Sequence, residues 1–139
     1  MFKTTLKKKW CFGLLAISFA GMNSFAGSDL SGTMKEMSSE LKQIQKQVSD
    51  ASQNASTIAL CDQLSQSIVQ AKTFTPKKVS DLPSEKQPSE QQAYGEKLDH
   101  LLETVGDMKA DLEKNDNAAA QALMPDLLQT KSEGHARFK

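Results

Sequence analysis

Apolar side chains recur at alternating intervals of four and three residues in two long segments of this chain, and this spacing constrains the possible folds most strongly. In the first segment they are Leu30, Met34, Met37, Leu41, Ile44 and Val48. In the second segment they are Tyr94, Leu98, Leu101, Val105, Met108 and Leu112. Because an α-helix turns once every 3.6 residues or so, such residues form a single stripe along it. We therefore predict two amphipathic helices, over residues 29–50 and 90–114, and expect Ser28 or Asp29 to cap the first.

Two further segments predict helices with less regular stripes. After a polar connection at residues 49–56, one stripe consists of Ile58, Cys61, Leu64, Ile68 and Ala71. This helix should end near Phe74, because Pro76 disfavours the helical conformation of the residue before it. After a capping turn at residues 115–117, the last stripe consists of Ala120, Leu123, Met124, Leu127, Leu128, His135 and Phe138. Pro125 lies within this last segment and predicts either a kink or a helix that restarts with the proline in its first turn.

The connections between these segments determine how four helices can pack. The first and third connections are short, whereas residues 75–89 contain three prolines and no helical period, so we expect a long exposed connection there. Helices joined by short loops pack antiparallel to their neighbours. The sequence therefore predicts an all-α protein with one domain, an antiparallel up-down-up-down four-helix bundle.

The first 26 residues have the pattern of a secretory signal peptide. A start with four lysines precedes an apolar run at residues 10–22, and Ser24-Phe25-Ala26 forms a small-x-small cleavage site. The apolar run is shorter than the roughly 20 residues that a transmembrane helix needs. We therefore predict that residues 1–26 are cleaved and that residues 27–139 are exported to the periplasm, with no membrane attachment afterwards.

Cleavage changes the charge and the cysteine content of the chain. The whole chain has 17 Lys and Arg against 17 Asp and Glu, and losing four lysines leaves 13 against 17, a net charge of −4. This excess of negative charge disfavours binding to nucleic acid. Cys61 is the one cysteine that remains, so no intrachain disulfide can form in the mature chain. We expect a monomer whose stability comes from packing, from a bound cofactor or from both.

Met34 and His135 are the residues most suited to binding a metal. In an up-down-up-down bundle the first helix starts at the end where the last helix finishes, and each residue then lies roughly 6–8 Å from that shared end. Both residues fall on apolar stripes, so we expect both side chains to be buried and to point inward. A thioether and an imidazole on opposite sides of an apolar slot suit the two axial positions of a haem iron. Each residue alone also has a simpler interpretation, the methionine as core packing and the histidine as a partner of the helix dipole.

A wider set of residues resembles the soluble cytochrome b562 family. The matching residues are Ser28-Asp29-Leu30, Met34, Leu41, Ile44, Thr75-Pro76-Lys77, Thr130, Lys131, His135 and Lys139. The resemblance covers nearly all of the mature chain. Because this family is itself a standard example of a short-loop four-helix bundle, the expected architecture rests partly on the resemblance.

The resemblance implies a haem site and assigns its residues. A methionine on the first helix and a histidine near the end of the fourth are the iron ligands of the family, and these positions correspond to Met34 and His135. The pocket wall is then expected to consist of Met37, Leu41, Leu64, Pro76, Leu98 and Leu101. Lys131, which stands where the family's best-known member has an arginine, should lie near the haem propionates.

The other cysteine and histidine signals are weaker. The chain contains no C-x-x-C-H motif, which attaches haem covalently, so the resemblance implies one non-covalent haem b per chain. Cys61 lies on an apolar stripe and is interpreted as a small buried side chain. His100, with Glu103 three residues later, has one half of a di-iron motif, but di-iron proteins need the motif twice. We therefore place His100 on an exposed face.

Two functions agree with these features. The first is a periplasmic b-type cytochrome, which is not an enzyme and exchanges single electrons with redox partner proteins that the sequence does not identify. The alternative is a haemless periplasmic helical chaperone or stress-responsive binding module, whose methionine-rich first helix would make adaptable contacts.

Overall fold

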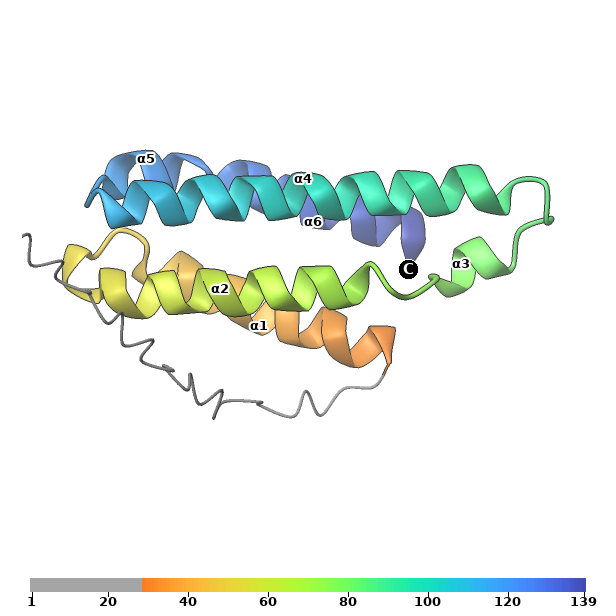
Figure 1. Ribbon diagram of the computed structural model, residues 1–139, viewed down its shortest axis with the longest axis horizontal. Helices are drawn as coiled ribbons and strands as arrows, with labels where there is room; N and C mark the ends of the chain where they lie inside the picture. Colours follow the sequence, from red (N-terminus) through yellow and green to blue (C-terminus); the bar gives the residue numbers. More distant parts are fainter. Residues whose placement is uncertain (1–28) are drawn as a thin grey trace, which may run out of the picture.

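The computed structural model describes residues 29–139, and every regular element within them is helical. The elements are α1 (Leu30–Gln47), a 3-10 turn (Ala51–Gln53), α2 (Asn54–Ala71), α3 (Lys77–Ser80), α4 (Gln87–Glu113), α5 (Asn117–Ala122) and α6 (Met124–Phe138). Four rods, namely α1, α2, α4 and the α5–α6 pair, run along the long axis of the molecule (Figure 1). The predicted all-α four-helix bundle is confirmed. The predicted signal peptide, residues 1–26, lies outside the described residues.

Side-chain caps fix two helix starts where the sequence indicated them. The Asp29 carboxylate accepts a hydrogen bond from the backbone N–H of Gly32 at 2.7 Å, so Asp29 caps α1. The Asp116 carboxylate accepts from the backbone N–H of Ala119 at 3.0 Å and caps α5 in the same way. Both caps satisfy backbone donors that have no partner within the helix.

The second helix begins earlier than predicted, because its first residue, Asn54, is polar but buried. The Asn54 side chain donates to the Asn117 side-chain oxygen at 3.2 Å, and the Asn117 amide donates back to the Asn54 oxygen at 2.7 Å. Asn54 therefore belongs to α2 and joins the α1–α2 turn to the start of α5. The expectation of an irregular connection over residues 49–56 was wrong at this point, since the polar composition of the segment concealed its packing.

The long connection between α2 and α4 also contains structure that the sequence did not predict. Helix α3 begins directly after Pro76, whose fixed φ suits a helix start, and it buries Val79. Helix α4 begins at Gln87 with Pro88 in its first turn, three residues before the predicted start. The expectation of a connection without a helix over residues 75–89 is therefore corrected.

The proline in the fourth rod restarts the helix, which was one of the two predicted outcomes. Helix α5 ends at Ala122, and α6 begins at Met124 with Pro125 in its first turn. At that position the missing N–H of proline costs no intrahelical hydrogen bond. Helix α6 then continues to Phe138 through Gly134.

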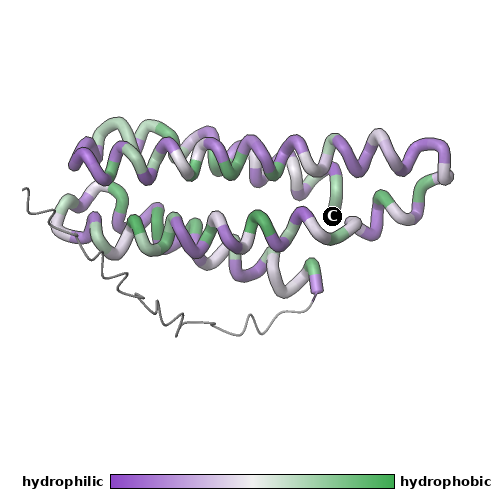
Figure 2. The backbone as a smooth tube through the Cα atoms, viewed as in Figure 1, coloured by the Kyte–Doolittle hydropathy of each residue, from purple (hydrophilic) through white to green (hydrophobic). Residues whose placement is uncertain are grey.

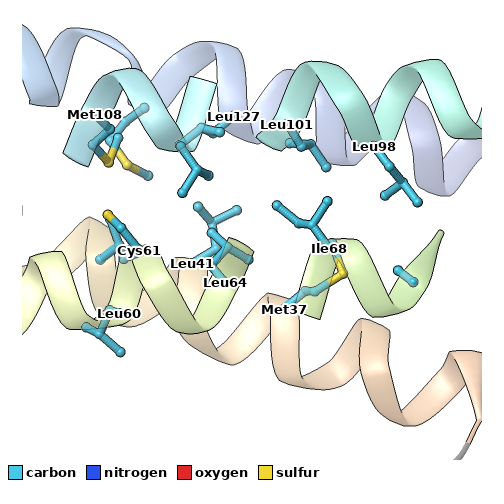
Figure 3. Close-up of a cluster of buried hydrophobic side chains, with 14 of the residues drawn as sticks. Met37, Leu41, Leu60, Cys61, Leu64, Ile68, Leu98, Leu101, Met108 and Leu127 are labelled. Carbon is cyan, nitrogen blue, oxygen red and sulfur yellow. The ribbon is translucent and has the colours of Figure 1, made fainter. Parts of the chain in front are cut away.

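The core consists of the predicted stripes. Leu64 and Ile68 on α2 lie across the core from Leu98 and Leu101 on α4, with Leu127 of α6 close by (Figure 3). Hydrophobic and hydrophilic residues are interspersed along every long helix, as amphipathic helices require (Figure 2). On α1 the stripe is buried from Met37 onward, whereas Leu30 and Met34 are only partly buried.

The bundle is closed on three sides and open on the fourth. Helix α1 packs against α2, α2 against α4, and α4 against α6, but α1 and α6 lack comparably close backbone packing. The start of α1 and the C-terminus lie toward the same end of the bundle (Figure 1). None of the described helices combines the length and the apolar character that crossing a membrane requires. The partial exposure at the start of α1 therefore coincides with the gap between the first and last rods.

Candidate functional site

A cavity of about 1090 Å³ lies where α1 and α6 fail to close the bundle. Its volume is slightly above the usual range for cofactor and small-molecule sites, about 300–1,000 Å³. All nine residues that the sequence singled out line this one cavity, namely Met34, Met37, Leu41, Leu64, Pro76, Leu98, Leu101, Lys131 and His135. The structure thus brings the predicted site together, while the role of each residue in it stays a prediction.

The two expected metal ligands stand on different walls of the cavity. Met34 lies on the second turn of α1, and His135 lies on the last turn of α6. Met34 is half-buried, but His135 is exposed, so the expectation that both side chains are buried was wrong. The physical reason is the gap between α1 and α6, which leaves the cavity open to solvent where these residues meet it.

The imidazole of His135 is held in its neutral form. Its pKa lies below the usual value of 6.5, first because the ring is partly desolvated and then because Lys139 and Lys131 repel a proton on it. Lys131 lies four residues before the histidine on α6, and Lys139, four residues after it, directly follows the helix, so the two lysines flank the ring. Neutral imidazole is the form that binds metals. At neutral pH His135 is therefore ready to donate its lone pair.

The floor of the cavity is aliphatic. Leu41 from α1, Leu64 from α2, and Leu98 and Leu101 from α4 are buried in the core and also line the cavity. Pro76, before α3, is buried at one side of it. A flat apolar ligand would cover this surface, and the burial would supply roughly 25 cal/mol for each Å² removed from water.

Contacts that the sequence did not reveal anchor the last turn of α6. The Arg137 guanidinium donates to both carboxylate oxygens of Glu90 on α4, at 3.0 and 2.8 Å. The Phe138 ring packs edge-to-face on Tyr94, with the ring centres 5.4 Å apart, and the Tyr94 hydroxyl donates to the Ala71 carbonyl at 2.8 Å. These contacts join α6 to α4 just after His135, and Tyr94 joins α4 to α2. Phe138 and Tyr94 were visible as stripe residues, whereas the Arg137–Glu90 pair left no signal in the sequence.

The remaining histidine and cysteine lie away from the cavity. His100 is exposed, as predicted, and its Nε2 lies 2.8 Å from a carboxylate oxygen of Asp126. Cys61 is fully buried, also as predicted, and burial raises the pKa of its thiol to about 11. Across residues 29–139 no group of three or more His, Cys, Asp or Glu is placed to hold a metal ion. Met34 and His135 are therefore the metal-binding candidates that share a site.

Comparison with known proteins identifies one family. The family model described as Cytochrome b562 matches residues 29–139, which includes every described residue. No curated protein matches the chain in a direct sequence comparison. The match spans all four rods and both walls of the cavity.

Proposed function

Because the chain belongs to the cytochrome b562 family, we propose that it holds one non-covalent haem b in the cavity, with Met34 and His135 as iron ligands. The family consists of b-type cytochromes that carry electrons. Of the two functions considered from the sequence, the family match favours the electron carrier over the haemless chaperone.

This proposal rests on one observation. The thioether of Met34 and the neutral imidazole of His135 line the same cavity, whose floor is aliphatic. The donor set fits a haem iron, the floor fits the porphyrin, and lysines at the opening, Lys131 among them, fit the propionates. When bound, haem supplies an iron that gains and loses one electron, and Met/His ligation raises its reduction potential. The chain itself supplies the two ligands, an aliphatic floor and a fixed last turn of α6.

We further propose that the protein works in the periplasm after removal of residues 1–26. The support is the pattern of lysines, apolar residues and small residues at the start of the sequence. The haem should be free of covalent attachment, because Cys61 is buried away from the cavity and the chain has no C-x-x-C-H motif.

A spectroelectrochemical titration of the haem-loaded protein tests electron transfer directly. We expect a reversible transition that follows the Nernst equation for one electron, because a single iron with two protein ligands stays bound in both oxidation states. Haem that is lost on reduction, or a transition that cannot be reversed, would contradict the proposed role as a carrier.

Acidification should release the haem, and the pKa of His135 fixes the direction of the effect. Its folded pKa lies below the unfolded value of 6.5, so the unfolded chain binds more protons between the two values. The stability from this group is therefore complete above pH 6.5 and is lost as the pH falls through the folded pKa. Since iron binds the neutral ring, the Kd for haem should rise about tenfold per pH unit below that folded pKa.

The variant Lys139→Gln tests the cause of this pH dependence. Lys139 is one of the charges that lower the pKa of His135. Without it, haem release should begin at a higher pH than in the unmodified protein, as measured by titrating the haem absorbance. Release at a lower pH in the variant would contradict this electrostatic account.

A further inference from the structure

Positive charge is concentrated around the opening of the cavity. Residues 29–139 contain 13 Lys and Arg against 17 Asp and Glu, so this part of the chain is negative overall. The cavity lining has the opposite balance, with seven lysines and two aspartates, Asp29 and Asp81. More than half of the basic residues in the described chain therefore line this one cavity.

Five of these lysines have no carboxylate partner among the described residues. We call them the lysine rim, which consists of Lys35, Lys42, Lys78, Lys131 and Lys139. The other two lining lysines are neutralised, Lys77 by Asp81 and Lys97 by Glu133. All rim lysines are exposed except Lys131, which is half-buried. They come from α1, α3, α6 and the C-terminal residue, so they approach the opening from several sides.

The basic surface continues beyond the cavity. A neighbouring hollow of about 320 Å³ is lined by Lys78, Lys86, Glu90 and Arg137 among other residues. Glu90 forms an ion pair with Arg137, so the unpaired charges that line this hollow are Lys78 and Lys86. Because Lys78 lines both hollows, the rim and this hollow form one continuous positive surface, which extends along α1 as far as Lys42.

The positive charge exceeds what a bound haem can neutralise. Counting side chains alone, seven lysines, two lining aspartates and the Glu133 partner of Lys97 leave an excess of four positive charges, and the α-carboxylate of Lys139 lowers it to three. The two propionates of a haem would leave one. A molecule with negative overall charge and a positive opening has a dipole that turns this opening toward a negative partner.

We propose that the lysine rim is the docking surface for an acidic redox partner protein, a proposal that rests on the proposed function. Electrons pass most readily where the cofactor comes nearest to the surface, and the rim surrounds the opening of its cavity. A compact acidic patch fits the rim, whereas an extended anionic surface, such as a membrane, would also face the negative remainder of the chain. We therefore favour a protein partner over a lipid surface.

Titration of ¹⁵N-labelled protein with poly-L-glutamate, in both the apo and the haem-loaded forms, tests the location of docking. We expect amide shifts at the lysine rim that disappear in about 0.5 M salt, because screening removes attraction between exposed charges. The variant K35Q/K42Q/K78Q should weaken binding about tenfold. The control K46Q/K109Q/K114Q removes the same charge outside both hollows, at two unpaired lysines and at Lys109, the partner of Asp62, and should weaken binding less than about twofold.

The outcomes separate the docking surface from the haem site. Absent shifts at the rim, or equal losses in the two triple variants, would overturn the docking surface even where the haem spectrum is intact. Tighter binding to phosphatidylglycerol vesicles than to poly-L-glutamate would overturn the choice of a protein partner. Failure to take up haem would instead contradict the proposed function, and it is read from the visible spectrum of the same samples.

Oxidation by ferricyanide gives a kinetic test. The lysine rim and the overall charge predict opposite effects of salt on its rate constant. Each ferricyanide ion takes one electron from the reduced protein and becomes ferrocyanide. The rim predicts that the second-order rate constant falls about tenfold as ionic strength rises from about 0.01 to 0.2 M, and less steeply in K35Q/K42Q/K78Q. A rate constant that rises with salt, as the net negative charge alone predicts, would overturn the proposal.

Discussion

Replacing His135 by alanine is expected to abolish tight haem binding, with Kd raised roughly 100-fold or more. The imidazole is the stronger of the two proposed iron ligands, and no other histidine lines the cavity. The contacts of Arg137 and Phe138 do not involve His135, so α6 should stay in place in this variant. The loss of haem binding then results from the missing iron ligand and not from unfolding. Haem titration followed by visible absorbance measures the change, and far-ultraviolet circular dichroism checks that the bundle stays helical.

Two further variants, Met34→Ala and His100→Ala, test whether the effect is specific to His135. Met34→Ala should have the milder effect, leaving a five-coordinate or water-ligated iron and a lower reduction potential, because the Met/His pair raises it. His100→Ala should leave spectrum and potential nearly unchanged, with a stability effect within about ±0.5 kcal/mol, since His100 is exposed. If His100→Ala abolished binding while His135→Ala kept a six-coordinate low-spin spectrum, the assignment of the ligands would be wrong.

Bound haem should also raise the stability of the bundle strongly. The cavity opens to solvent beside α1 and α6, and its aliphatic floor exists only while the helices are packed, so a ligand that covers this floor binds the folded state alone. At a free haem concentration of 100 Kd the stabilisation is about 2.7 kcal/mol. For a domain of this size that corresponds to a rise in Tm of roughly 10 °C. Thermal unfolding followed by circular dichroism, with and without haem, measures the shift.

The variant His135→Ala is the control for this shift. At the same haem concentration it should melt at nearly the same temperature with and without haem, because its affinity is too low to fill the cavity. An unmodified protein whose Tm does not respond to excess haem would place the ligand outside the core and contradict the proposed site.

The main helices could be predicted because a single physical rule determines them. Ile44, Val105 and Met108 are fully buried, as helical spacing of apolar residues requires. The nine expected residues line one cavity because of the topology. An up-down-up-down bundle places the start of the first rod and the end of the last rod at the same end. Here the resemblance to a known family supplied the assignments, and the packing of the helices supplied the location.

Other features depended on contacts between distant residues, which local patterns do not contain. The buried Asn54–Asn117 pair turned an apparently polar connection into the start of α2. Glu90 and Arg137 are 47 residues apart, and their ion pair exists only once α4 and α6 are packed. The exposure of His135 follows from the gap between α1 and α6, which no helical period predicts.

The visible spectrum of the purified protein with added haem, followed by extraction in acid acetone, tests the proposed b-type haem site. We expect one haem per chain, a six-coordinate low-spin spectrum in the reduced state, and complete extraction of the colour, because the iron has two protein ligands and the porphyrin has no covalent bond to Cys61. A protein that takes up no haem, or colour that remains on the protein after extraction, would contradict a non-covalent b-type haem held by Met34 and His135.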